Sequence, residues 1–298
     1  MVSRRTMLLA PLTPLAISVV RGTHMTLSVH QNTSAAAGYR KSLEGWARAG
    51  IRNVEITAQL LDDFLKTDSL ASARRVLTDL GLTPVSCACG VQNLWEPNPK
   101  HAEAIDNLTR RCEMLATLGL KRFYAPVTAT TKFTQDDYPA GVDNMRKVGD
   151  VAKQFDMLAM VEFTRASTYV ATLGTMLKMV HQAAHPQMRG LFDCYHFWSG
   201  QSKFEDLDGL QPGEIAHVHF QDVPDMPREL LGQATRFIPG DGVTPLVKIL
   251  RKLSEKGSYA GPLSVELFLP KFQEGDPFEV AREIRRKSEA VMRQARVL

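Results

Sequence analysis

Short apolar segments alternate with longer amphipathic segments along most of the chain. The short segments are rich in β-branched and aromatic residues, which is typical of buried strands, and the longer ones have the spacing of amphipathic helices. The expected strands cover residues 26–31, 52–57, 83–90, 121–127, 157–163, 189–195, 214–222 and 262–268. The expected helices lie near 38–49, from 58 to about 80, and near 99–118, 139–154, 168–184, 203–210, 244–256 and 276–296.

This alternation predicts an α/β fold, and more closely a (β/α)8 TIM barrel. Uninterrupted strand–helix alternation implies a parallel sheet covered by helices. Eight units in about 270 residues fit a closed barrel better than an open sheet. The sequence has neither a GxGxxG after its first strand nor a GxxxxGK[ST] motif, so nucleotide-binding open sheets lose their main support. No linker or shift in composition interrupts the pattern, so we expect residues 25–298 to form a single catalytic domain.

Residues 1–24 form an extension of a different character. Arg4 and Arg5 precede an apolar run, which is the arrangement of a twin-arginine export signal. Two prolines interrupt that run and no A-x-A-like cleavage site follows it, while Met25 stands directly before the first expected strand. We therefore expect a cytoplasmic protein, with export to the periplasm by the twin-arginine route as the alternative.

Composition narrows the classes of partner. The chain has 298 residues, 44% of them hydrophobic and 23% charged, which is ordinary for a globular protein with its own core. The formal net charge of +4 is small and no long basic run occurs, so neither nucleic acid nor a membrane surface is an expected partner. The cysteines lack the CxxC spacing of a structural zinc site, and we expect them to be small buried side chains: Cys87, Cys89, Cys112 and Cys194.

Polar residues gather at the carboxyl ends of the later strands. Glu162 ends the fifth, Asp193 ends the sixth with His196 three residues later, His219 lies in the seventh, and Glu266 stands near the end of the eighth. In a barrel these ends share one face. Burying three carboxylates together without a counter-ion would cost many kcal/mol, and a divalent cation removes that cost. The sequence therefore predicts one divalent metal ion held by the three carboxylates and the His219 imidazole.

The expected ligand set also limits the metal and the chemistry. Three carboxylates and one imidazole favour Mn²⁺ first, with Mg²⁺, Co²⁺ or Zn²⁺ as alternatives. Four protein ligands leave one or two positions for substrate oxygens. A vicinal hydroxy-ketone would fill these positions, and the metal would then polarise the carbonyl and acidify the neighbouring C–H.

Five further residues are candidate parts of the site. Glu55, at the end of the second strand, is expected in the pocket or behind the ligands, and His217 is expected to pack beside His219. Asp222 is expected to orient His219 or a loop. Trp95 and Trp198 follow strands three and six, where they would cover a sugar ring or form contacts in a homo-oligomer.

The strand-end motifs resemble those of the xylose isomerase-like barrel superfamily, which also contains the endonuclease IV barrels. The shared order is Glu on strand five, Asp-x-x-His on strand six, His on strand seven and Glu on strand eight. Within the superfamily the chain is most similar to the inosose (2-keto-myo-inositol) isomerases, over roughly residues 26–296. The matching stretches are GLFDCYHFWSG, HVHFQDVPDMPRE, RFIPGDG and SVELFLP.

The resemblance implies specific roles. It makes Glu162, Asp193, His219 and Glu266 metal ligands, as the residues themselves suggest. It adds His196 and Arg236 as residues that hydrogen-bond substrate oxygens, and it makes Glu162 and Glu266 the catalytic groups that shuttle protons, as in related ketose epimerases.

The chain departs from the inosose isomerases at two strands. His30, Gln31 and Asn32 replace an Asn-Glu pair on strand one, and CACG replaces an Asn-containing run on strand three. Both strand ends would line the pocket, so we expect His30 to contact the substrate, and the resemblance does not identify that substrate.

The leading hypothesis is a metal-dependent isomerase or epimerase that acts on a small-molecule sugar or cyclic polyol ketone through an enediolate. A lyase, either a dehydratase or a keto-glycoside-cleaving enzyme, would share the first step and stays open. An endonuclease IV-like phosphodiesterase is less favoured because it needs several more histidines and a basic surface. A non-catalytic sugar-binding barrel would not need the two glutamates.

Overall fold

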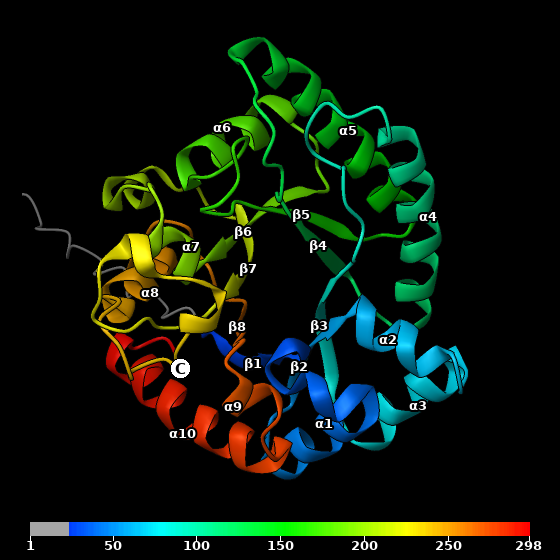
Figure 1. The fold of residues 1–298 in the computed structure, drawn as a ribbon, viewed down its shortest axis with the longest axis vertical. Coiled ribbons are helices and arrows are strands. Elements are labelled where there is room, and N and C mark those ends of the chain that lie inside the picture. Colours follow the sequence, from blue (N-terminus) through cyan, green and yellow to red (C-terminus); the bar gives the residue numbers. More distant parts are fainter. Residues whose placement is uncertain (1–23) are drawn as a thin grey trace, which may run out of the picture.

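The protein forms a closed barrel of eight parallel strands in the order β1 to β8, with β1 pairing with β8. The computed structural model describes residues 24–298, so the expected extension and export signal lie outside the described residues, apart from His24. Strands surround the centre of the molecule and helices form a ring outside them (Figure 1). The prediction of a TIM barrel is confirmed.

The observed strands have four to six residues, and most are shorter than the strands expected from the sequence. The strands are β1 Thr26–His30, β2 Asn53–Thr57, β3 Thr83–Ala88, β4 Arg122–Pro126, β5 Leu158–Glu162, β6 Met188–Asp193, β7 Ile215–His219 and β8 Pro262–Val265. Glu162, Asp193 and His219 are the last residues of their strands, and Glu266 follows β8 directly. The predicted site residues therefore stand at the carboxyl ends of four consecutive strands.

The helices follow the expected alternation. They are α1 Gly38–Arg48, α2 Ala58–Leu65, α3 Leu70–Asp79, α4 His101–Thr117, α5 Tyr138–Gln154, α6 Leu173–Ala183, α7 Cys194–Ser199, α8 Leu246–Glu255, α9 Pro270–Gln273 and α10 Pro277–Ala295. Short 3₁₀ segments cover Gln31–Ala37, Gln135–Asp137, Phe204–Gly209, Arg228–Leu230 and Gln233–Thr235. The segment expected as a helix near 203–210 is thus a 3₁₀ turn.

Side-chain caps explain where the boundaries differ from the expected ones. The helical stretch after β2 is two helices, because the Ser69 hydroxyl accepts from the Ser72 amide and begins α3 anew. Thr172 caps α6 in the same way, so that helix begins at Leu173 instead of near 168. The Asp193 carboxylate accepts from the His196 amide at 2.6 Å, which ends β6 and begins α7.

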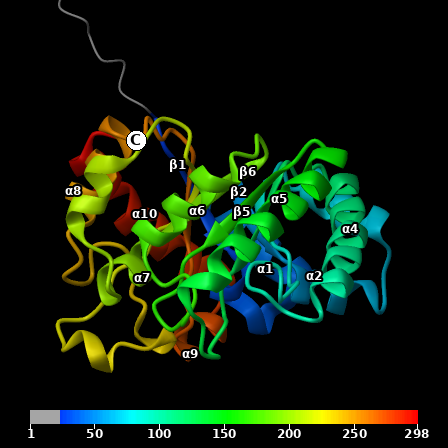
Figure 2. The same cartoon turned by 90° about the horizontal axis from the view of Figure 1, so that it is seen from above.

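The two ends of the barrel differ. At one end the C-terminus lies beside the start of β1, where the Met25 amide donates to the Val297 carbonyl at 2.6 Å (Figure 2). At the other end lie α9 and the long connection from β7 to α8, drawn in yellow. This second end is the carboxyl face of the strands, where barrel enzymes place their reacting groups.

Close packing of α1 against α10 makes one glycine critical. A β-carbon at Gly45 would lie 2.6 Å from Pro277 Cβ and 2.9 Å from the Phe278 backbone nitrogen. We expect Gly45→Ala to lower the free energy of unfolding by about 1–3 kcal/mol in urea denaturation, because the two helices must separate. Gly174→Ala is the control, since its β-carbon would meet Asp206 at an ordinary 3.5 Å and alanine favours the helix. Equal stability of the two variants would contradict this account of the packing.

The four cysteines are free and buried, as expected. Among residues 24–298, no helix is long and apolar enough to cross a membrane. The compartment stays a prediction.

Candidate active site

Three carboxylates converge on one nitrogen of His219. The Nδ1 atom lies 3.0 Å from Glu162 Oε1, 3.4 Å from Asp193 Oδ2 and 3.6 Å from Glu266 Oε2. All four side chains are at most 6% exposed. They come from β5, β6, β7 and the residue after β8, which are neighbours around the barrel (Figure 1). The structure thus brings together all four predicted metal ligands, which form the carboxylate cluster.

Neighbouring side chains fix the orientation of Asp193. Its Oδ1 accepts from the His196 amide, and its Oδ2 accepts from Gln221 Nε2 at 2.7 Å and from Arg236 Nη1 at 3.0 Å. Gln221 was not among the predicted residues. The signal was available in the sequence, because Gln221 follows His217 and His219 at the two-residue spacing of one strand face.

A buried arginine partly neutralises the cluster. Arg236 is 1% exposed, and its Nη1 lies 2.5 Å from Glu266 Oε2 as well as 3.0 Å from Asp193. Its Nε donates to Gln233 Oε1 at 2.8 Å, and its guanidinium lies over the rings of Tyr195 and Phe268. Arg236 is therefore held rigidly beside two of the predicted ligands.

Burial and neighbouring charges shift the pKa values of the cluster in different directions. Burial raises the pKa of Glu162 to about 7, against the lowering effect of His219 and with the help of Asp193 and Glu266. Burial alone would lower the pKa of His219, but the carboxylates around it, Glu55 first, hold that pKa well above its usual range. Burial would raise the pKa of Asp193, yet Arg236, His196 and His219 together keep it below its ordinary value.

This charge balance fits a divalent cation. Glu55 and the three carboxylates of the cluster surround His219, whereas Arg236 contacts only Asp193 and Glu266, so negative charge exceeds positive charge around the imidazole. Ligand atoms of Glu162, Asp193 and His219 lie within 4.8 Å of one another, close enough to share one ion. Oxygen donors with a single imidazole suit Mn²⁺, Mg²⁺, Co²⁺ or Zn²⁺.

Comparison with known proteins identifies the family of this barrel. A family model described as "Xylose isomerase-like TIM barrel" matches residues 43–291. The chain belongs to this family. The resemblance inferred from the strand-end motifs is confirmed at that level.

Named relatives of this xylose isomerase-like barrel include isomerases and a dehydratase. The inosose isomerase of Halalkalibacterium halodurans is 25% identical over 236 residues, which cover 78% of this chain and 83% of the relative. A 3-dehydroshikimate dehydratase of Pseudomonas putida is 23% identical over 238 residues, covering 76% of this chain but only 36% of the relative.

A solved structure shares the fold closely. The IOLI protein, crystallised with a zinc atom, superposes with a TM-score of 0.84 at 23% identity, covering 91% of this chain and 99% of that protein. At this identity the likeness demonstrates the shared barrel fold.

A second group of possible ligands in the barrel consists of His30, Glu55 and His219. His30 Nδ1 accepts from the Asn32 amide at 3.2 Å, so a neutral ring carries its proton on Nε2. That nitrogen lies 3.0 Å from the Tyr124 hydroxyl and 3.6 Å from Glu266 Oε1. His30 therefore has no free lone pair for a metal, and the structure places it as a neighbour of Glu266.

Glu55 lies deeper in the barrel than the carboxylate cluster. It is 0% exposed, and its Oε2 lies 2.9 Å from Nε2 of His217, one strand layer below His219. The expected packing of His217 beside His219 is observed, with ring centroids 5.7 Å apart. Of the two positions expected for Glu55, this placement favours the one behind the metal ligands. Contact of Glu55 with a substrate stays a prediction.

Asp222 orients a loop. Its Oδ1 accepts from the Val223 and Thr244 amides, and its Oδ2 accepts from the Gly240 and Gly242 amides. Of the two roles expected for Asp222, the structure shows the second and gives it no contact with His219. The turn at 239–242 is thus tied to the end of β7.

The two loop tryptophans differ in exposure. Trp95 is 1% exposed and donates from Nε1 to the Ala125 carbonyl at 3.0 Å, so its ring is packed inside the protein. Trp198 lies in α7 and is partly buried, with the Arg228 guanidinium 4.1 Å above its ring. Contacts of either ring with a substrate or with a second copy stay predictions.

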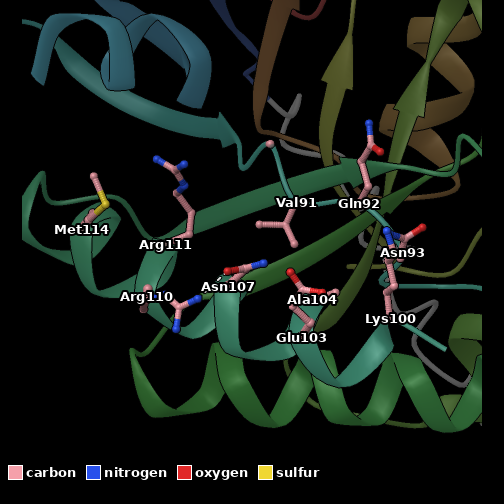
Figure 3. A pocket seen from close by; sticks show the side chains of 11 residues that line it. Val91, Gln92, Asn93, Lys100, Glu103, Ala104, Asn107, Arg110, Arg111 and Met114 are labelled. Atoms are coloured by element: carbon pink, nitrogen blue, oxygen red, sulfur yellow. Dashed lines mark hydrogen bonds between the residues drawn. The ribbon is translucent and has the colours of Figure 1, made fainter. Parts of the chain in front are cut away.

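A separate cavity of about 570 Å³ lies along α4, beside the residues that follow β3 (Figure 3). Its lining includes Lys100, Glu103, Arg110 and Arg111 but no member of the carboxylate cluster. Arg111 is paired with Asp62 through two hydrogen bonds of 2.7 and 2.8 Å. This cavity is not part of the candidate active site.

Proposed function

We propose that the chain is a divalent-metal-dependent isomerase or epimerase that acts on a sugar or cyclic polyol ketone. The observation that carries the proposal is the convergence of Glu162, Asp193 and Glu266 on His219 Nδ1. The name of the Halalkalibacterium relative, inosose isomerase, supports the class of substrate.

The proposed chemistry is proton transfer next to a ketone. A bound divalent ion supplies Lewis-acid polarisation of the ketone, which acidifies the adjacent C–H. Glu162 and Glu266 would hold the ion together with Asp193 and His219. The two glutamates approach from β5 and from beyond β8, on either side of Asp193 and His219, so one can remove a proton and the other can return one from a different direction.

His196 and Arg236 are suited to bind a substrate oxygen. The pKa of His196 is lowered to about 4, mainly by burial, so its ring is neutral near pH 7. Its Nδ1 accepts from the Arg165 amide at 3.2 Å, which leaves the proton on Nε2. Nε2 also lies 3.2 Å from Arg236 Nη2, a contact that is a hydrogen bond only when Nε2 carries the lone pair. In the tautomer with the proton on Nε2, a substrate oxygen near both nitrogens would accept from each of them.

His196→Ala should therefore weaken substrate binding more than metal binding. We expect KM to rise by about tenfold, because one hydrogen bond to a substrate oxygen is lost, while metal content stays near that of the wild type. Steady-state kinetics and elemental analysis measure the two quantities. His181→Ala, which alters a half-exposed histidine on α6, is the matched control. A loss of metal with an unchanged KM would show that the role of His196 is misassigned.

A lyase is the second candidate, favoured by the relative named 3-dehydroshikimate dehydratase. Both reactions begin with removal of the same proton and differ in the second step, which is either reprotonation or loss of a leaving group. A set of polyol ketones incubated in D₂O, with Mn²⁺ restored after chelation, separates them. Deuterium at the carbon next to the carbonyl without loss of water supports the isomerase or epimerase, and loss of water supports the dehydratase.

A further inference from the structure

One buried carboxylate has no place in the proposed proton transfer. Glu55 stands on β2, and its Oε2 lies 2.9 Å from His217 Nε2 and 3.3 Å from His219 Nε2. All three side chains are 0% exposed. Glu55 Oε1 has no hydrogen-bond partner. An ionised side chain with so few partners is costly to bury, so its position calls for an explanation.

The two nitrogens of His219 face different carboxylates. Nδ1 faces the carboxylate cluster, and Nε2 faces Glu55. A neutral imidazole has one N–H and one lone pair. Whichever nitrogen carries the proton, the other is left as the possible metal ligand.

Two other groups near His219, Asp222 and His30, do not supply an acceptor for Nε2–H. Asp222, the other carboxylate near the end of β7, is bound by four backbone amides of its loop. His30 carries its own proton on Nε2, because its Nδ1 accepts from the Asn32 amide, and is a donor there. Nε2 makes no hydrogen bond to the described residues, and Glu55 Oε2, 3.3 Å away, is the carboxylate oxygen that faces it.

We propose that Glu55 is a positioning residue that keeps the N–H of His219 on Nε2 and so directs the lone pair of Nδ1 at the divalent ion. The inference rests on the proposed function, because it assumes that the carboxylate cluster holds a metal. His217 donates to the same Glu55 oxygen from the adjacent layer and so fixes that carboxylate in place. Carboxylates that accept from the second nitrogen of a ligating histidine usually change metal affinity 10- to 100-fold when removed.

Zinc affinity of the full chain tests the inference. After chelation, zinc is titrated in competition with a chromophoric chelator for the wild type, Glu55→Gln and Asp222→Asn. We expect Glu55→Gln to bind zinc about 10- to 100-fold more weakly, and Asp222→Asn to stay within about twofold of the wild type. Circular dichroism and thermal unfolding establish that each variant is folded. A folded Glu55→Gln variant with wild-type affinity would overturn the inference.

A spectroscopic measurement on the wild type does not require the Glu55→Gln variant to fold. Two-bond ¹H–¹⁵N correlations of ¹⁵N-histidine protein with zinc report which nitrogen of each ring is protonated. The signals missing from His219→Gln identify the His219 ring. We expect zinc on Nδ1 and the proton on Nε2, and zinc on Nε2 would overturn the inference.

Failure of the metal site and failure of the role of Glu55 give different results. A wild-type protein that binds no zinc would refute the proposed metal site itself. A wild type that binds zinc, paired with a folded Glu55→Gln variant of equal affinity, would refute only the role of Glu55.

Discussion

Replacing Glu266 with glutamine should abolish turnover, lowering kcat by about 10²- to 10⁴-fold, while the protein stays folded. An amide cannot accept a proton from carbon, and it is a poorer metal ligand than a carboxylate. The shape of the side chain is kept, and the amide oxygen can still accept from Arg236, which now lies 2.5 Å from Glu266 Oε2. The barrel therefore retains its packing around the altered residue.

Kinetics with the substrate found by the D₂O survey, together with circular dichroism, measure this effect. Glu103→Gln is the matched control, because Glu103 lies exposed on α4 and outside the carboxylate cluster. We expect the control to retain wild-type activity. Near-normal turnover by Glu266→Gln would refute the proposed role of Glu266.

Removal of divalent ions should have an effect of similar size. We expect chelation followed by dialysis to reduce turnover to background, and added Mn²⁺ to restore it, because the proton transfer depends on polarisation of the ketone. The ion should also stabilise the fold, by about 2.7 kcal/mol at a concentration 100 times its Kd. Activity and thermal unfolding, measured before and after restoration, report both effects. Full activity in the stripped protein would contradict the proposal.

The barrel could be predicted from the sequence because its elements are encoded locally. Each strand is a short apolar run, and each major helix an amphipathic one. Short elements were missed, and one of them, α7, has only six residues and continues the apolar run of β6. Its start depends on one hydrogen bond from the His196 amide to Asp193, which no hydrophobic pattern encodes.

The carboxylate cluster could also be predicted, because parallel strands end at one face and the four residues stand at those ends. Contacts that depend on the direction of a side chain could not be predicted from the sequence. Glu55 and His217 are 162 positions apart in the sequence, and their pairing requires the register of the closed barrel. Trp95 is likewise buried against β4, where its Nε1 donates to the Ala125 carbonyl. Its position in a loop after strand three did not indicate this contact.

The role of Asp222 is a second example of a contact that the sequence does not determine. The sequence left open whether this carboxylate orients His219 or a loop, since both lie within reach of the end of β7. Backbone amides from the turn at 239–242 bind it in the folded chain, and the position behind His219 falls to Glu55 from β2. Which carboxylate takes which position depends on loop conformation, and spacing along the chain does not determine it.

The central claim is that Glu162, Asp193, His219 and Glu266 share one ion, and anomalous diffraction at the zinc edge from crystals grown with zinc tests it most directly. The account predicts a single peak about 2.0–2.2 Å from His219 Nδ1 and from an oxygen of each of the three carboxylates. A peak elsewhere in the barrel, or a carboxylate cluster without any peak, would contradict it.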